Sequence, residues 1–279
     1  MRQIEVAQVT QAVKAAAIAA NYEPGDDLLA ALAQGLEAEE SPAGQEIFRQ
    51  LLDNARITSQ ERIPLCQDCG LVVVFAELGQ DLHLTGGGFA EAVQEGIRQG
   101  YAEGYLRKSL CHPLSRANTG DNTPAVIHTE IVPGDRLKLT VVPKGGGSEN
   151  MSRLYMLKPA EGLAGIKGKV VATVAEAGPN PCPPIIVGVG IGGTFERAAL
   201  LAKKSLLREL GQANPDPELA DLERQLLTEV NDLGIGPQGL GGRITAMAVH
   251  ILMQPCHIAS LQVAVNLHCH ASRHKEVVL

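Results

Sequence analysis

The stretch PCPPIIVGVGIGGTFERAALLAKKSLLREL, residues 181–210, sets the fold class. Its pattern predicts a Pro-rich loop, a buried apolar strand, a glycine turn and a helix that begins near Thr194. The rest of the chain adds further helices and strands, and several of the strands can pair as hairpins. This mixture predicts an α/β or α+β fold with mixed sheets and surrounding helices, without fixing the order of the strands.

Hydrophobic periodicity and turn residues predict the remaining elements. The expected helices cover 3–20, 27–38, 44–59, 89–106 and 217–232. The expected strands cover 71–78, 125–132, 136–143 and 169–175, with two more in 243–266 around QPCHIAS. The strands 125–132 and 136–143 are joined at the turn VPGD. Because the chain has no internal repeat and no long linker, we expect a single domain over 1–279.

Composition and charge exclude some classes of function. Hydrophobic residues make up 45% of the chain and charged residues 20%, which is normal for a globular protein with a buried core. The formal net charge of −7 argues against a nucleic-acid-binding protein, which usually carries a basic stripe. An anionic small molecule is still possible, because a few local Arg and Lys residues set the field in a pocket.

The sequence pattern gives no sign of a signal peptide or of a membrane-spanning segment. The opening MRQIEVAQVTQAVKAAAIAA has no continuous apolar region of the kind that a signal peptide needs. The uncharged stretch PCPPIIVGVGIGGTF is too short and too rich in Gly and Pro to span a bilayer. We therefore expect a cytoplasmic protein that does not enter a membrane. Its six cysteines are then expected to be thiols or metal ligands rather than structural disulfides.

A C-x-x-C pair lies in IPLCQDCGLVVVF, residues 63–75, as Cys66 and Cys69. A redox dithiol usually sits between a strand and a helix N-terminus, whereas here a loop precedes a strand and an acidic residue separates the thiols. A zinc site needs a second pair at matching spacing, and CHPL and HCH are irregular. The pair can also be one metal ligand and one bystander.

Three cysteines lie where predicted strands meet loops: Cys66, Cys182 and Cys269. Such junctions hold a ligand rigidly while leaving it reachable. Three thiolates from distant segments often hold an iron–sulfur cluster, and one iron then keeps an open position that can act as a Lewis acid. The alternative is that each cysteine is a small buried hydrophobic residue. Cys111 and Cys256 are less clearly placed.

Glycine-rich segments and isolated polar residues add candidates. KGGGSEN, residues 144–150, can present backbone N–H groups to an anion, although it lacks the spacing of a P-loop. GVGIGG, residues 188–193, matches G-x-G-x-x-G, but no acidic residue follows at the distance that a dinucleotide site requires, and we interpret it as a tight turn. His257 can be a catalytic residue or a buried histidine whose hydrogen bonds are satisfied within the core. Arg107 can bind an anion or carry a surface charge at the end of a helix.

Taken in order, five segments resemble the class I fumarate hydratases. These are PLCQDCG, RKSL with NTGDNTPAVIH, KGGGSEN, CPPIIVGVGIGGTFERAALLAKKSLLREL and HIASLQVAVNLHCHASRH. The similarity is to the α subunit, or N-terminal region, of fumarate hydratase and of the related L(+)-tartrate dehydratase. It extends from about residue 5 to residue 275.

The resemblance implies a [4Fe-4S] cluster held by Cys66, Cys182 and Cys269. It also implies a substrate pocket, in which Arg107 and the glycine loop would stabilise charge on a carboxylate. Asp68 or His257 would orient the substrate or a bound water. The implied catalytic residues are Asp68, His257 and Arg107, and the implied substrate-binding residues are Gln67, Arg107, Gly145, Gly146 and Gly147.

The implied activity is the reversible hydration of fumarate to (S)-malate, with L(+)-tartrate dehydration as the alternative. The family's catalytic base lies on a β subunit or C-terminal domain, for which this chain has no room, so we expect an α subunit that works in an α2β2 assembly. Two positions depart from the family pattern, which has Thr in place of Cys69 and a second Arg in place of His274. A rival of another class is a non-enzymatic zinc- or redox-binding module built on Cys66 and Cys69.

Overall fold

The computed structural model describes residues 2–279, and the chain forms two compact units. The first unit contains the residues up to Pro24, 55–146 and 273–279, and the second contains 25–54 and 147–272. We predicted a single domain because no linker is visible in the sequence. Two of the unit boundaries lie inside helix α3 (Pro42–Glu61) and at the start of helix α5 (Gly146–Asn150), where the sequence has no linker. The other two lie between Pro24 and Gly25 and between Ser272 and Arg273.

The first unit is built on a four-stranded sheet with the order β10-β5-β2-β4. Strand β2 (Leu71–Gly79) is parallel to β4 (Val126–Val132) and antiparallel to β5 (Leu137–Lys144), while β10 (Lys275–Val278) closes the other edge. The predicted strands 71–78, 125–132 and 136–143 are confirmed. However, β4 and β5 are not paired, because their connection crosses the end of β2, where the Gly79 N–H donates to the Arg136 carbonyl.

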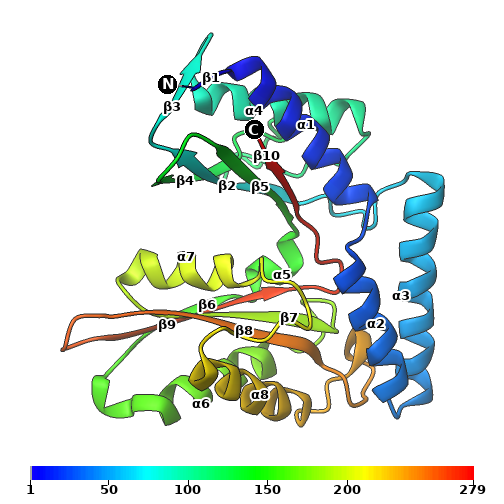
Figure 1. The fold of residues 1–279 in the computed structure, drawn as a ribbon. Coiled ribbons are helices and arrows are strands. Elements are labelled where there is room, and N and C mark those ends of the chain that lie inside the picture. Colours follow the sequence, from blue (N-terminus) through cyan, green and yellow to red (C-terminus); the bar gives the residue numbers. More distant parts are fainter. Residues whose placement is uncertain (1) are drawn as a thin grey trace. The chain divides into compact units, whose positions relative to one another are not determined.

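Two helices cover one face of this sheet (Figure 1). They are α1 (Val6–Tyr22) and α4 (Phe89–Glu103), which pack against each other. In α1 the buried residues Val6, Val9 and Val13 recur at helical spacing and form one apolar stripe. The core is made mainly of Val, Ala, Leu and Ile, in agreement with the scarcity of aromatic residues. A short parallel ladder joins β1 (Arg2–Glu5) to β3 (Leu82–Thr85).

The second unit holds a four-stranded sheet with the order β6-β9-β7-β8. Strand β7 (Ile185–Gly192) is parallel to β8 (Ala246–Gln254) and antiparallel to β9 (Leu261–His268), which also pairs with β6 (Arg153–Leu157). Helix α7 lies on one face of the sheet, and α6 and α8 lie on the other (Figure 1). Their bounds, with those of the other helical segments, are α2 Asp26–Ala38, η1 Pro159–Glu161, α6 Gly162–Ala177, α7 Phe195–Ser205, α8 Pro217–Asn231 and η2 Pro237–Gly239.

Most predicted helices are confirmed, and one predicted strand is wrong. The helices expected over 3–20, 27–38, 44–59, 89–106 and 217–232 correspond to α1, α2, α3, α4 and α8, and α7 begins directly after Thr194. Residues 169–175 belong to helix α6 rather than to a strand. Ile166, Val170 and Val174 are buried along one helical face, and this spacing of four outweighs the strand preference of the β-branched residues there.

The glycines of GVGIGG lie in strand β7 rather than in a turn, up to Gly192. A Cβ added to Gly190 would lie 2.0 Å from the Ala198 carbonyl oxygen in α7. Gly188 and Gly190 therefore let α7 approach the sheet closely, and our interpretation of the whole motif as a tight turn is wrong. No helix formed by residues 2–279 is both long enough and apolar enough to cross a membrane.

Candidate active site

The Cys66 loop, defined as residues 66–70, is fixed within the first unit by hydrogen bonds to its own main chain. The phenol of Tyr101 donates to the carbonyl oxygens of Cys69 and Gly70. The side-chain amide of Asn122 donates to the Gly70 carbonyl at 3.0 Å. Gly70 has φ +74°, and an added Cβ would lie 2.7 Å from the main chain of β5, so glycine is required there. The loop therefore presents Cys66 from a rigid backbone.

Asp68 ties the Cys66 loop to the glycine loop, defined as Gly145–Gly147. Its Oδ1 accepts the N–H of Gly70 at 2.9 Å, and its Oδ2 accepts the N–H of Gly146 at 2.7 Å. The main-chain N–H of Asp68 itself points at the Sγ of Cys66, 3.4 Å away. The structure thus brings together Cys66, Asp68 and Gly146, which are separated by up to 80 positions in the chain.

Cys69 is a buried structural residue. Its side chain is 1% exposed and belongs to the apolar core of the first unit. Its Sγ donates to the Cys66 carbonyl at 3.7 Å and accepts the N–H of Arg107 at 3.2 Å. Burial raises the pKa of the Cys69 thiol, which favours the protonated form and opposes the thiolate that a redox dithiol or a zinc ligand needs. Cys69 therefore links the Cys66 loop to the segment that carries Arg107.

Gln67 and Arg107 are the exposed candidates of the first unit. The Oε1 of Gln67 accepts a hydrogen bond from the Cys66 thiol at 3.3 Å. Arg107 follows the end of α4, where Tyr105 turns the chain with φ +48°. Among residues 2–279 no side chain forms a hydrogen bond or an ion pair with the Arg107 guanidinium. An exposed guanidinium of this kind is suited to bind a carboxylate through two parallel hydrogen bonds.

Tyr101 and Asn122 support the site, and sequence reasoning missed their role. Asn122 is fully buried with φ +62°, and its Oδ1 accepts the N–H groups of Ser109 at 2.7 Å and Leu110 at 3.2 Å. Its place in NTGDN indicates a turn, and NTGDNTPAVIH belongs to a segment that resembles the family, but neither predicts that the Asn122 side chain reaches Gly70. Tyr101 gave no signal, because it looks like one more residue on the buried face of α4.

Cys182 lies in a strained loop that precedes β7 in the second unit. Its φ of +55° falls in the left-handed region, which is costly for a residue with a side chain. Its N–H donates to the Pro179 carbonyl at 3.0 Å. Gln238 donates both its main-chain and its side-chain N–H to the Pro183 carbonyl at 2.8 Å. An exposed thiol held by a strained backbone is typical of a functional position.

The segment that carries Cys269 lies beside the Cys182 loop. His270 donates its N–H to the Cys182 carbonyl at 3.4 Å, and its Nδ1 lies 3.0 Å from the same oxygen. Because β7 and β9 are antiparallel with Ile186 opposite His268, the residues before β7 and after β9 meet at one end of the sheet. The structure therefore brings the segments of Cys182 and Cys269 together.

Helix α5, which continues from the glycine loop, is anchored to β9. Lys203 of α7 forms an ion pair with Oε1 of Glu149 at 2.6 Å. The side-chain amide of Asn266 donates to Oε2 of Glu149 and to the hydroxyl of Ser152, both at 2.9 Å. These contacts fix the chain directly after the glycine loop, so this loop is held firmly at both ends.

His257 lies at the other end of the second unit's sheet. It is exposed in the turn between β8 and β9, where the Gly193 N–H donates to the Pro255 carbonyl. Figure 1 shows this turn at the far left tip of the sheet, away from the end of β9. The eight residues of β7 span roughly 25 Å between the two ends. Within one chain, the structure does not bring His257 to Cys182 and Cys269.

The donor set fits a thiolate-ligated iron–sulfur cluster. None of the six cysteines is in a disulfide. Cys66 and Cys269 are partly buried and Cys182 is exposed, so none of the three thiols is enclosed in an apolar core. The Asp68 N–H directed at the Cys66 sulfur is the kind of hydrogen bond that tunes cluster ligands. The residues present are therefore compatible with the cluster that the resemblance implies.

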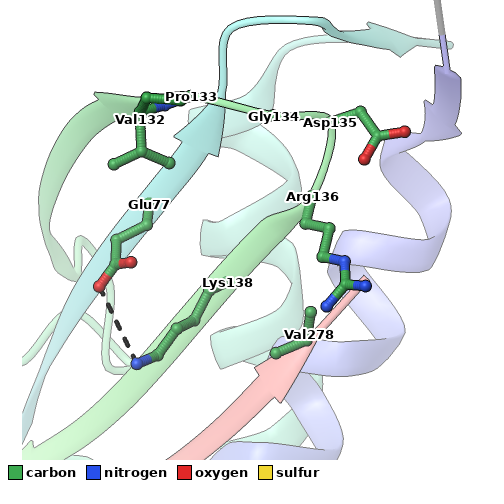
Figure 2. A pocket seen from close by; sticks show the side chains of 8 residues that line it. All are labelled: Glu77, Val132, Pro133, Gly134, Asp135, Arg136, Lys138 and Val278. Carbon is green, nitrogen blue, oxygen red and sulfur yellow. Dashed lines mark ion pairs between the residues drawn. The ribbon is translucent and has the colours of Figure 1, made fainter.

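A separate groove of about 390 Å³ lies on the first unit's sheet and contains none of the predicted site residues. Figure 2 shows Lys138 directed toward Glu77 along one side of this groove. Lys138 forms ion pairs with Glu77 at 3.9 Å and with Glu276 at 3.0 Å. These carboxylates offset the charge of Lys138, and Arg136 and Asp135 add one charge of each sign to the lining.

Comparisons with known proteins agree with this geometry. A model of the fumarate hydratase (fumerase) family matches residues 10–278. A putative L(+)-tartrate dehydratase subunit alpha of Methanocaldococcus jannaschii is 42% identical over 261 residues, which cover 91% of this chain and 91% of the relative. The L(+)-tartrate dehydratase alpha subunits of Escherichia coli and Shigella sonnei are each 34% identical over 252 residues, or 89% of this chain and 83% of each relative.

The family match spans both units, and it includes the Cys66 loop, the glycine loop and the segments of Cys182 and Cys269. The relatives extend over nearly the same length as this chain. The order of motifs, the clamped cysteine loops and the similarity along the chain lead to one conclusion: the protein belongs to the fumarate hydratase family of hydro-lyases.

Proposed function

We propose that the chain is the α subunit of a [4Fe-4S]-dependent hydro-lyase that reversibly hydrates fumarate to (S)-malate. The observation that carries this proposal is the Cys66 loop, which is fixed by hydrogen bonds and carries Cys66, Gln67 and the carboxylate of Asp68 on one turn. In the proposal Cys66, Cys182 and Cys269 are the cluster ligands. When bound, such a cluster keeps one iron open as a Lewis acid that assists departure of hydroxide.

Arg107 is the proposed anchor for a substrate carboxylate. During addition or loss of water, negative charge develops on the carboxylate next to the carbon that exchanges a proton. A guanidinium that already lies in the site stabilises this charge without reorganisation. The link from the Arg107 N–H to the buried Cys69 sulfur fixes the main chain from which this side chain extends.

Asp68, Gln67 and the glycine loop complete the proposed substrate side of the site. The Gly146 N–H is occupied by Asp68, so in this proposal its contribution is to position the loop. Gly145 and Gly147 are the other two residues of the loop that the proposal assigns to substrate binding. Asp68 would orient the substrate or a water molecule from a side chain that two backbone N–H groups hold in place.

His257 keeps a catalytic role in the proposal only as a residue supplied by a second copy of the chain. The length of β7 separates it from Cys182 and Cys269 within one chain. Apolar residues are exposed in and beside the turn that carries it: Ile258 is 91% exposed, and Met253, near the end of β8, is 53% exposed. Burying them against a second α chain would gain free energy, and it would give a physical reason for the pair of α subunits in an α2β2 assembly.

A β subunit is the other proposed partner, and it would supply the catalytic base. The relatives are named as alpha subunits, which supports the requirement for a second polypeptide. The proposed setting is the cytoplasm, where thiols are kept reduced and available as cluster ligands. Neither a nucleic acid nor a membrane has a part in this proposal.

L(+)-tartrate dehydration is the second candidate, and the names of the relatives favour it. Both substrates are four-carbon dicarboxylates, so the guanidinium of Arg107 and the Lewis-acid iron could act on either one.

The test of the two candidates is to purify the chain anaerobically with its β subunit and to compare kcat/KM for fumarate hydration and for tartrate dehydration. A preference for fumarate supports the leading proposal, a preference for tartrate establishes the second candidate, and no activity on either contradicts both.

Substitution of Arg107 tests the proposed substrate contact in the same assay. Arg107→Gln should lower kcat/KM by about 100-fold or more, because it removes a charged donor from the developing carboxylate charge. Arg107→Lys should recover only part of this loss, since lysine cannot form the two parallel hydrogen bonds. Arg49→Gln, an exposed position on α3, is the matched control. Unchanged kinetics of Arg107→Gln would remove this residue from the site.

A further inference from the structure

Arg273 is a buried cation with incomplete hydrogen bonding. It lies two positions before β10, and the residue is 5% exposed. Its Nη2 donates to the main-chain carbonyl of Asp68, 205 positions away in the sequence. Its Nε and Nη1 are buried, and neither has a partner among residues 2–279. The guanidinium therefore reaches the Cys66 loop while two of its nitrogens remain unsatisfied.

A buried guanidinium whose one partner is a neutral carbonyl is unfavourable, because it has lost hydration without gaining a counter-charge. The neighbouring groups do not supply that charge. The Cys69 thiol donates to the Cys66 carbonyl, and the Tyr101 phenol donates to the carbonyls of Cys69 and Gly70, so each of these groups carries its proton in these contacts. The carboxylate of Asp68 is engaged by the N–H groups of Gly70 and Gly146.

An anion from outside the polypeptide is therefore the natural partner, and the position of Arg273 indicates which one. The carbonyl that it contacts belongs to the residue two positions after Cys66, a proposed cluster ligand. A substrate carboxylate would approach from the exposed side, where Gln67 and Arg107 lie. Arg273 is instead buried, and it contacts the main chain of the Cys66 loop. Thiolates and sulfides of a cluster carry net negative charge at such a position.

We propose that Arg273 is a positioning residue for the iron–sulfur cluster, in that it clamps the Cys66 loop and balances the negative charge of the ligated cluster. This inference rests on the proposed function, because it requires a cluster on Cys66. A positive charge next to a cluster favours the reduced state and stabilises the thiolate ligands. Arg273 should therefore raise the reduction potential of the cluster and slow the loss of iron.

The test compares Arg273→Gln and Arg273→Lys with the wild type, each reconstituted anaerobically together with the β subunit. The measurements are the midpoint potential of the cluster and the rate of iron loss to a chelator. Arg273→Gln should shift the potential to a more negative value and speed iron loss by about 10- to 100-fold, the range found for groups that orient metal ligands. Arg49→Gln, far from any cysteine in the sequence, should match the wild type in both.

Arg273→Lys distinguishes the effect of the positive charge from the effect of the hydrogen bond to the Cys66 loop. It also provides the test if Arg273→Gln does not fold. Lysine keeps the positive charge but lacks the planar fork of donors. Its potential should stay close to that of the wild type while its iron loss becomes faster. Wild-type potential and wild-type iron loss in Arg273→Gln would overturn the inference, as would unchanged iron loss in Arg273→Lys. A wild-type protein that forms no cluster would overturn the proposed function itself.

Discussion

The surroundings of Cys69 in the structure change the interpretation of this residue. In the sequence it completes a C-x-x-C pair with Cys66. In the structure its sulfur lies in the core, between the Cys66 carbonyl and the Arg107 N–H. The two thiols of the pair thus have different environments, since one is buried and protonated and the other lies at the loop surface. The hydroxyl of serine or threonine in place of Cys69 could donate and accept in the same two hydrogen bonds.

His250 is a buried neutral histidine on strand β8. Burial and, to a smaller extent, the positive charge of Arg208 lower its pKa from 6.5 to about 4, while Glu223 opposes the shift. Its side chain is 3% exposed, and its Nδ1 has no partner among the described residues. Between pH 6.5 and 4 the unfolded chain binds a proton at this position that the folded chain does not, so stability falls as the pH falls through this window.

Replacement of His250 should flatten the pH dependence of stability. Between pH 7.5 and pH 4.5 the wild type should lose about 2.5 kcal/mol more free energy of unfolding than His250→Gln, since one pKa unit corresponds to about 1.4 kcal/mol. Urea unfolding at the two pH values measures the difference. Arg49→Gln, at an exposed position on α3, provides the comparison and should follow the wild type. Parallel curves for His250→Gln and the wild type would show that His250 is protonated in the folded state.

The packing of α7 on β7 depends on glycines within the strand. A Cβ at Gly190 would meet the Ala198 carbonyl oxygen at 2.0 Å and the Ala202 nitrogen at 2.5 Å. Both atoms belong to the helix backbone, which cannot move away as a flexible side chain would. Close helix-to-sheet packing therefore explains a glycine pattern that resembles a nucleotide-binding motif in the sequence.

Gly190→Ala should lower the free energy of unfolding by about 3 kcal/mol, because overpacking forces helix α7 away from the sheet. Gly168→Ala is the matched control, since a Cβ there meets nothing within 4 Å and alanine is the better helix former. The control should gain up to about 1 kcal/mol. Urea midpoints with unchanged m-values measure both effects. Equal midpoints for the two alanine variants would contradict the packing explanation.

Helical periodicity made most helices predictable, but it could not give the order of the strands. The apolar stripes of α1 and α8 are properties of short segments, so the sequence displays them directly. The sheet of the first unit instead pairs β5 with β2 and with β10, and β10 lies more than 130 residues later. Such pairings depend on tertiary packing. Helix α6 was mispredicted because its local β-branched residues favour a strand, whereas burial of one face favours a helix.

The candidate site was predictable where its residues lie in motifs and unpredictable where they act through distant partners. Cys66, Cys182 and Cys269 stand in segments that resemble a known family as sequence. Tyr101 and Asn122 reach the Cys66 loop from 31 to 52 positions away, and Arg273 reaches it from 205 positions away. No short pattern encodes contacts of this kind. His257 shows the converse, because it stands in a family motif yet lies at the far end of the sheet from Cys182.

At the scale of the whole molecule, the proposed activity depends on a β subunit. The isolated chain should bind a cluster but show no hydration of fumarate and no dehydration of tartrate, and addition of the β subunit should restore activity. Exposure of the complex to air should then abolish activity, because an iron with an open coordination position is readily lost. Activity assays before and after mixing, and before and after air, measure these effects. Full activity of the isolated chain, or activity that survives air, would contradict the proposed assembly and mechanism.

The decisive measurement is iron and sulfide content, with the visible absorption spectrum, after anaerobic reconstitution of the wild type and of single cysteine variants. The wild type should hold about four irons per chain. Cys66→Ala, Cys182→Ala and Cys269→Ala should each lose the brown chromophore, while Cys69→Ala and Cys111→Ala, at non-ligand positions, should retain it. A chromophore that survives Cys182→Ala but is lost in Cys69→Ala would instead establish a site on the C-x-x-C pair and contradict the three-cysteine cluster.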